Sequence, residues 1–209
     1  MYLSHANSLL FRFSHGARFR KTLELIDARP GEVVLDYGCA DGRLLKMLPE
    51  SVKGIGYDPN PEYGMSDTSH LPCCSCDVIT VCEVFEHVSE SEVTRILKEC
   101  HRLLKPQGRL IVSVPIEVGL SALVKNLARW IKVRPLERQL TVKNVLRAAL
   151  YFPAKREPEY LDVYGHTGFD YRKLKLNGFT VARKEFSPLP FGPLLNSQIF
   201  LVLLIGQPV

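Results

Sequence analysis

The chain has 209 residues, of which 46% are hydrophobic and 23% are charged, and its formal net charge is +5. This length fits one α/β domain with a sizeable core, and the composition excludes disordered, fibrous and disulfide-stapled proteins. Three of the six cysteines crowd residues 73–76, a spacing that suits neither a disulfide framework nor paired zinc knuckles. We expect a single domain over residues 1–209 without a metal site.

Residues 1–30 are predicted to form one or two helices that end at Arg29-Pro30-Gly31. Their short apolar runs lack the continuous core of a signal peptide. The most apolar stretch, Ile199–Ile205, is far shorter than the roughly 20 residues of a spanning helix. We therefore expect a cytoplasmic protein, with at most a peripheral membrane association.

The next part of the chain alternates strands and helices. We predict strands at 32–37, 52–57, 76–81 and 109–114, and helices at 43–48 and 90–104, with a stop at 105–108. Alternation at this spacing is typical of crossover units. It predicts an α/β fold with a doubly wound, mostly parallel sheet and helices on both faces.

The second half of the chain departs from this pattern. Apolar residues recur at helical spacing over 119–131 and again over 142–150, where a plain crossover needs one helix. We therefore predict that residues 117–162 form an inserted, basic helical cap. A helix at 170–176 follows, and strands at 180–186 and 198–205 should form an antiparallel hairpin at the end of the sheet.

A glycine-containing loop joins the first predicted strand to its helix. It reads Asp36-Tyr37-Gly38-Cys39-Ala40-Asp41-Gly42. Glycine lets the backbone turn sharply and approach a ligand closely, and ligands of doubly wound sheets bind beyond the carboxyl ends of the strands. The loop alone also fits a tight turn that only packs strand against helix.

The second predicted strand ends in Asp58-Pro59. A carboxylate there can accept hydrogen bonds from both ribose hydroxyls of an adenosine, a geometry that nicotinamide and adenosylmethionine enzymes share. The alternative is a solvated loop acid. The missing third glycine of the dinucleotide fingerprint weakens the nicotinamide interpretation.

Further segments follow in register: Ser66–Pro72, Cys76–Val88 and His101–Leu110. Together with the glycine loop and Asp58, they resemble the ordered motifs of class I S-adenosylmethionine-dependent methyltransferases, of the small-molecule and ubiquinone-biosynthesis type. The resemblance spans residues 32–115 and returns weakly at 165–169. It implies S-adenosyl-L-methionine as cofactor and a Rossmann-like sheet of seven strands whose last strand is antiparallel.

The resemblance also implies roles for individual residues. The backbone from Gly38 to Gly42, through Cys39, Ala40 and Asp41, would lie against the methionine part of the cofactor, and Asp36 would orient this loop or reach the ammonium group. Asp58, followed by Pro59, would bind the ribose, Asp67 the adenine amino group, and Thr68 would lie beside the ring. Asp67 also suits a turn or helix cap. Cys39 and Cys82 fit as small fillers near the cofactor, and Cys82 and Glu83 would complete the cofactor-binding residues.

Glu83, Glu86 and His87 follow the strand at 76–81, at the edge where the transferable methyl group should point. Methyl transfer from a sulfonium is an in-line displacement, so alignment of the two substrates can supply much of the catalysis. If the acceptor is a hydroxyl, His87 can take its proton, because free histidine has a pKa of ~6.5. His166 could face the same pocket. For both histidines an ordinary loop or packing role is the alternative.

The predicted cap is strongly basic. Residues 121–156 contain nine Lys and Arg and one acid, Glu137. Three interpretations compete: a solvated helix face, a surface for anionic lipid, and a surface for an acidic or nucleic-acid substrate. Leu-rich faces with few stacking aromatics favour an anionic membrane surface over RNA.

We expect methyl transfer to an O, N or C atom of a small-molecule or lipid-linked acceptor. One alternative is an RNA or protein methyltransferase, although Cys82-Glu83-Val84-Phe85 replaces the Asn-Pro-Pro-Tyr signature of adenine or glutamine N-methylation. The other is a cofactor-binding scaffold without turnover. The sequence does not identify the acceptor, because no motif in the cap specifies it.

Overall fold

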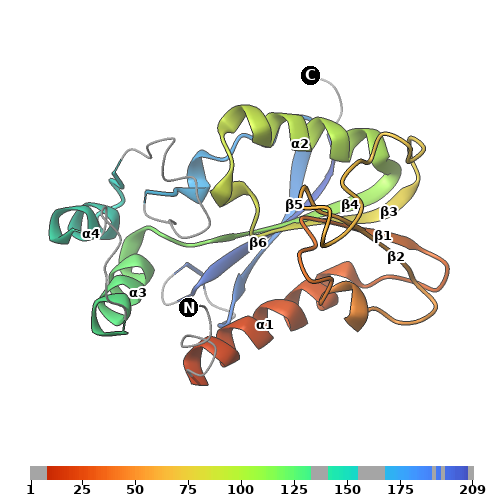
Figure 1. Cartoon of the computed structure of the whole chain (residues 1–209). Helices are drawn as coiled ribbons and strands as arrows, with labels where there is room; N and C mark the ends of the chain where they lie inside the picture. The colour runs from red at the N-terminus through yellow and green to blue at the C-terminus, as the bar shows by residue number, and fades with distance from the viewer. Residues whose placement is uncertain (1–8, 133–140, 155–167, 190–191, 194–195, 207–209) are drawn as a thin grey trace.

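A computed structural model describes residues 9–132, 141–154, 168–189, 192–193 and 196–206, with side chains described from Gly16 to Leu127 in the first range (Figure 1). In these residues one six-stranded sheet has the order β2-β1-β3-β4-β6-β5. The strands are β1 (Val33–Tyr37), β2 (Lys53–Tyr57), β3 (Cys76–Cys82), β4 (Leu104–Pro115), β5 (Phe179–Ser187) and β6 (Gln198–Ile205).

The strand directions confirm the predicted topology. Strands β2, β1, β3 and β4 pair in parallel, whereas β6 runs antiparallel to both β4 and β5. The expected seventh strand is not formed in the described residues. Between β2 and β3 the chain makes a single parallel bridge, Tyr57 to Met65. Residues 58–75 contain three prolines, which cannot donate to a strand ladder, and this explains the missing strand.

Two helices cover opposite faces of the sheet, α1 (Leu9–Ile26) and α2 (Glu90–Leu103) (Figure 1). Alternate residues of a strand point to opposite faces. In β1, Val34 packs with Leu25 and Ile26 of α1, while Leu35 belongs to the cluster that contains Leu97 of α2. The sheet is therefore the middle of three layers, as the alternating pattern predicts.

Helix α2 forms over its predicted range because the sequence marks both its first turn and its apolar face. Ser89 caps the first turn by accepting a hydrogen bond from the Glu92 amide at 3.2 Å. The apolar side chains of α2 recur at helical spacing and are buried against the sheet; they are Val93, Ile96, Leu97, Cys100 and Leu103.

Two predicted helices are wrong in the described structure. Residues 43–48 form only the 3₁₀ turn η1 (Leu45–Met47), because Pro49 holds the preceding Leu48 in an extended conformation with ψ 149°. Residues 170–176 form only the 3₁₀ turn η4 (Tyr171–Lys173), which ends where Leu174 becomes extended. The predicted helix stop at 105–108 is confirmed, since α2 ends at Leu103, but the strand predicted at 109–114 is longer and β4 already includes residues 105–108.

Helices α3 (Gly119–Lys132) and α4 (Val142–Ala149) form where the sequence predicts them, and both lie beyond the end of β4 (Figure 1). Thr141 caps α4 by accepting from the Asn144 amide at 3.2 Å. The predicted cap over 117–162 includes residues 133–140 and 155–162, which lie outside the described residues, so the complete cap stays a prediction. In the described part of the chain, every helix is too short or too polar to cross a bilayer.

Candidate active site

The loop after β1 lies at the carboxyl edge of the sheet and is held by the end of β2. The amides of Gly38 and Cys39 both donate to the Tyr57 carbonyl, at 2.7 and 2.9 Å. Gly38 has φ 91°, and a Cβ there would lie 2.6 Å from Cγ2 of Val84, so only glycine fits. Gly42 has φ 67° and nothing lies within 4 Å of its Cβ position. The backbone at Gly42 is therefore accessible to a ligand.

Asp58 lies directly against this loop. Its Oδ2 accepts a hydrogen bond from the Ala40 amide and its Oδ1 accepts one from the Asn60 amide, each at 2.9 Å. An ionised carboxylate can accept about four hydrogen bonds. Asp58 therefore fixes the loop that precedes it and the turn that begins at Pro59, and it keeps acceptor capacity for further hydroxyl groups.

Asp36 is buried at the end of β1. Burial raises its pKa to about 6, opposed by a hydrogen bond from Thr80 Oγ1 to Asp36 Oδ1 at 2.7 Å and assisted by the nearby Asp58. A cation bound at the loop would favour the ionised carboxylate. Asp36 therefore combines an orienting bond across the sheet with a charge that a cationic ligand can stabilise.

Three other predicted residues differ in character. Cys39 is buried under the loop, and a Cβ on Gly56 would lie 2.9 Å from its Sγ, so the thiol fills this space. Burial raises the pKa of Cys39 to about 11 and that of Cys82 to about 12, which keeps both thiols neutral and unreactive. Asp41 is exposed and pairs with Arg43 at 3.2 Å.

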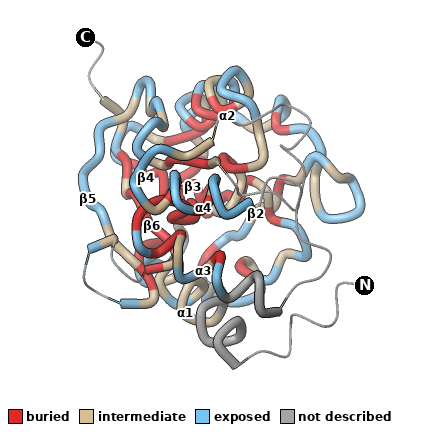
Figure 2. The backbone as a smooth tube through the Cα atoms, turned by 90° about the vertical axis from the view of Figure 1, so that its left-hand side faces the viewer, coloured by how far each residue is buried: buried red, intermediate tan, exposed pale blue. Residues whose placement is uncertain are grey.

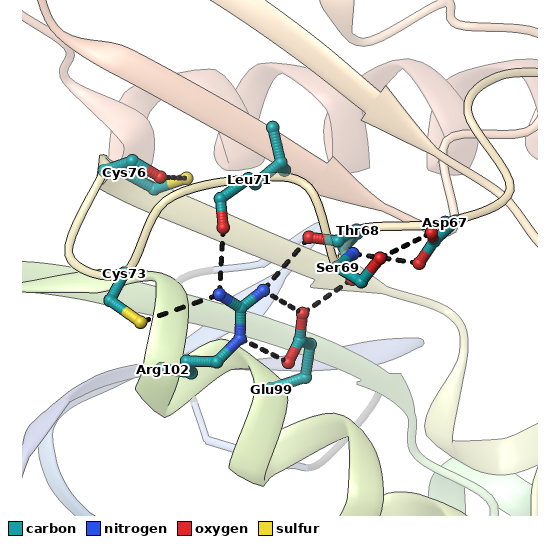
Figure 3. A network of polar contacts seen from close by, with 9 residues as sticks. Asp67, Thr68, Ser69, Leu71, Cys73, Cys76, Glu99 and Arg102 are labelled. Atoms are coloured by element: carbon teal, nitrogen blue, oxygen red, sulfur yellow. Dashed lines mark hydrogen bonds and ion pairs between the residues drawn. The ribbon is translucent and has the colours of Figure 1, made fainter.

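The predicted adenine-binding segment is a tight turn (Figure 3). Asp67 accepts hydrogen bonds from the amide and the hydroxyl of Ser69 at 2.9 and 2.6 Å, and these bonds lower its pKa. Thr68 is buried and its hydroxyl donates to Oε1 of Glu99 in α2 at 2.6 Å. Asp67 thus caps the turn and Thr68 faces α2, while the predicted contacts of both with adenine stay predictions.

Arg102 of α2 holds this turn from the side of the helix (Figure 3). Its guanidinium donates to the carbonyls of Thr68 and Leu71 at 3.0 and 2.9 Å, and it pairs with Glu99 at 2.6 Å. Glu99 and Arg102 were not predicted from the sequence. Their i,i+3 spacing on a helix predicts an ion pair but does not reveal the turn that they support.

A buried polar cluster surrounds Glu83, which follows β3 with φ 58°. Glu83 Oε1 accepts from the Ser113 hydroxyl of β4 at 3.2 Å, and Oε2 accepts from Gln198 of β6 at 2.9 Å and pairs with Arg18 of α1 at 3.3 Å. Burial raises the pKa of Glu83, while Arg18, Lys125 and Ser113 oppose the rise. Four elements thus meet at one carboxylate.

The partners of Glu83 were not predicted from the sequence. Ser113 and Gln198 could have been noticed, because each is a polar residue in or beside an apolar strand. Arg18 carries no such signal, since it is one of several basic residues in α1. Lys125, counted with the basic cap, instead donates to the carbonyls of Ile116 and Ser197, both at 2.9 Å.

His87 lies on the 3₁₀ turn η2 (Phe85–His87), next to the fully buried Glu86. Its Nε2 is 3.9 Å from Glu86 Oε1, and its side chain is 26% exposed. His87 is therefore placed at the same edge as Glu83, whereas His166 lies outside the described residues.

Comparison with known proteins agrees with this geometry. A family model described as a methyltransferase domain matches residues 10–135. A Mycolicibacterium smegmatis protein named a probable S-adenosylmethionine-dependent methyltransferase is 30% identical over 107 residues, and a Xanthomonas oryzae pv. oryzae ubiquinone biosynthesis O-methyltransferase is 31% identical over 115 residues. The matches cover 44% of this chain and 41% and 47% of these relatives, so the chain spans less than half the length of either.

A solved structure shares the fold over nearly its whole length. The SAM dependent methyltransferase from Archaeoglobus fulgidus superimposes with a TM-score of 0.53 and 16% sequence identity. The superposition covers 94% of this chain and 99% of the other.

Proposed function

The chain belongs to the methyltransferase domain family, and we propose that it transfers a methyl group from S-adenosyl-L-methionine to an O, N or C atom of a small-molecule or lipid-linked acceptor. The observation that carries this proposal is the contact between the glycine loop and Asp58, through the Ala40 amide. It joins a backbone that a ligand can approach to a carboxylate that can bind a ribose.

The residues at this edge fit the cofactor. Gly42 leaves its side of the loop open, which suits the methionine part of the ligand. Asp58 keeps acceptor positions for two ribose hydroxyls, and a nearby ammonium group would favour the ionised form of Asp36. When bound, S-adenosylmethionine supplies an electrophilic methyl group on a positively charged sulfur.

The cluster around Glu83 supports an acceptor site on the other side of the methyl group. Glu83 is held by residues of β4, β6 and α1, so its carboxylate is rigid. A rigid, partly exposed carboxylate can orient an acceptor that donates a hydrogen bond, and orientation is the main requirement of an in-line displacement. Replacing Glu83 should therefore lower turnover more than cofactor affinity.

For a hydroxyl acceptor, His87 is the candidate base. The imidazole would accept the hydroxyl proton while the acceptor oxygen forms its bond to the methyl carbon and the carbon–sulfur electron pair stays with sulfur. Glu86, with its Oε1 3.9 Å from His87 Nε2, would stabilise the resulting imidazolium. An acceptor without an acidic proton would not require this step.

The acceptor is tested by incubating the protein with radiolabelled S-adenosylmethionine and a cell extract, and then separating lipid, small-molecule, RNA and protein fractions. We expect label in the lipid or small-molecule fraction with the wild type and a strongly reduced amount with Asp58→Asn. Glu50→Gln is the control, since Glu50 is an exposed acid away from the loop contacts. Label confined to RNA or protein would refute the acceptor class, and no transfer with retained binding would indicate a scaffold.

A further inference from the structure

Helices α3 and α4 present two rows of exposed apolar side chains. The α3 row is Leu120, Val124 and Leu127, with exposed fractions of 43–48%. The α4 row is Val142, Leu146 and Leu150, with exposed fractions of 53–69%. Spacings of three and four residues place each row on one face of its helix. Phe152, just after α4, is 71% exposed. We call these seven residues the α3–α4 apolar surface.

The opposite faces of both helices are buried, so the outward direction of this surface is determined by packing. Ala122 of α3 and Val145 and Ala148 of α4 are buried. The Ser121 hydroxyl also donates to the Pro193 carbonyl at 2.6 Å, which ties α3 to the body of the protein. In Figure 2 this end of the molecule faces the viewer, with exposed segments of α4 at its centre.

The charged side chains of the two helix segments all have one sign. Residues 119–132 and 141–154 contain no Asp or Glu. Lys143 and Arg147 are exposed and one helical turn apart, and on a helical projection they lie directly beside the Val142, Leu146 and Leu150 row. An apolar helix face bordered by Lys and Arg is the pattern of helices that lie in a membrane interface, where the basic groups meet lipid phosphates.

We propose that the α3–α4 apolar surface docks on an anionic lipid bilayer, with its apolar rows in the interface and Lys143 and Arg147 at the headgroups. The charge selects this occupant, since a neutral or basic protein partner would leave Lys143 and Arg147 without complementary groups. The surface follows β4, whose carboxyl end also carries the polar cluster of the candidate site (Figure 1). Docking requires neither cofactor nor turnover, so it is tested independently of the proposed function.

The experiment is co-sedimentation with phosphatidylcholine vesicles that contain or lack phosphatidylserine, at ~0.1 M and ~1 M salt, where the screening length falls from about 10 Å to about 3 Å. The wild type should bind the anionic vesicles at low salt and lose most binding at high salt. Lys143→Gln/Arg147→Gln should weaken binding more than tenfold, at about fivefold per basic group. Leu146→Gln/Leu150→Gln should weaken it about tenfold or more.

Matched controls change the same chemistry elsewhere. Lys53→Gln/Lys184→Gln removes the same charge from exposed positions on β2 and β5, and Val181→Gln replaces an exposed apolar residue of β5. Both should bind like the wild type, and thermal melting confirms that every variant is folded. The proposal is overturned if the wild type does not bind anionic vesicles at low salt, binds neutral vesicles equally, binds RNA instead of vesicles, or if the controls lose binding as the test variants do.

Discussion

Replacing Arg102 tests whether α2 positions the turn that we assign to adenine. In Arg102→Gln the turn loses hydrogen bonds to the Thr68 and Leu71 carbonyls, and Glu99 loses its ion partner. A net hydrogen bond contributes about 1 kcal/mol, and a partly exposed ion pair contributes about 0.5 kcal/mol. The free energy of unfolding should therefore fall by about 2–3 kcal/mol, which lowers the melting temperature by roughly 5–10 °C in a chain of this size.

The matched control is Arg95→Gln on the same helix. Arg95 makes the same i,i+3 pair, with Glu92 at 2.6 Å, but its side chain is exposed and its guanidinium donates to the Glu92 carboxylate rather than to the turn. The loss of this ion pair should lower the free energy of unfolding by no more than about 0.5 kcal/mol. Differential scanning calorimetry measures stability, and titration with S-adenosylhomocysteine should show about tenfold weaker binding for Arg102→Gln alone. Equal stability and affinity in the two variants would refute the positioning role of Arg102.

Three further predictions concern the loop and the candidate base. Burial raises the pKa of Asp36 from 3.8 to about 6, so the folded state holds this proton more tightly than the unfolded state does. The free energy of unfolding should therefore fall by about 3 kcal/mol as pH rises from about 4 to about 6. Asp36→Asn should remove that fall in pH-dependent denaturation. His87→Ala should lose turnover but keep S-adenosylhomocysteine affinity, whereas the control His101→Ala, exposed on α2, should keep both, and unchanged turnover in His87→Ala would exclude His87 from proton transfer. Gly38→Ala should destabilise more than Gly31→Ala in thermal melts, because both have positive φ but only Gly38 lacks room for a Cβ, and equal losses would contradict this.

The parts of the fold that the sequence predicts well are those with a clear local pattern. The β6 range is predicted fully, since an apolar, β-branched run is bounded by polar and turn residues. The 43–48 helix fails because Pro49 limits the segment to one turn, and the prediction did not take Pro49 into account. The seventh strand came from the family resemblance alone, and the prolines between β2 and β3 prevent it.

The candidate site shows the same division. Asp58 and the glycine loop lie together because β1 and β2 are neighbours along the chain and in the sheet. Glu83 was selected from the sequence, but its partners were not. Arg18 and Gln198 reach it from α1 and β6, and contacts between positions so far apart depend on how the layers pack. No local pattern encodes such a contact.

Calorimetric titration with S-adenosylhomocysteine and, separately, with NAD tests the central claim most directly, since it measures the cofactor half of the site without requiring the acceptor. We predict that the wild type and Glu50→Gln bind S-adenosylhomocysteine and that Asp58→Asn binds it at least tenfold more weakly, about the loss expected for its ribose hydrogen bonds. None of the three should bind NAD. Binding of NAD alone, or equal binding of S-adenosylhomocysteine by Asp58→Asn, would contradict the assignment.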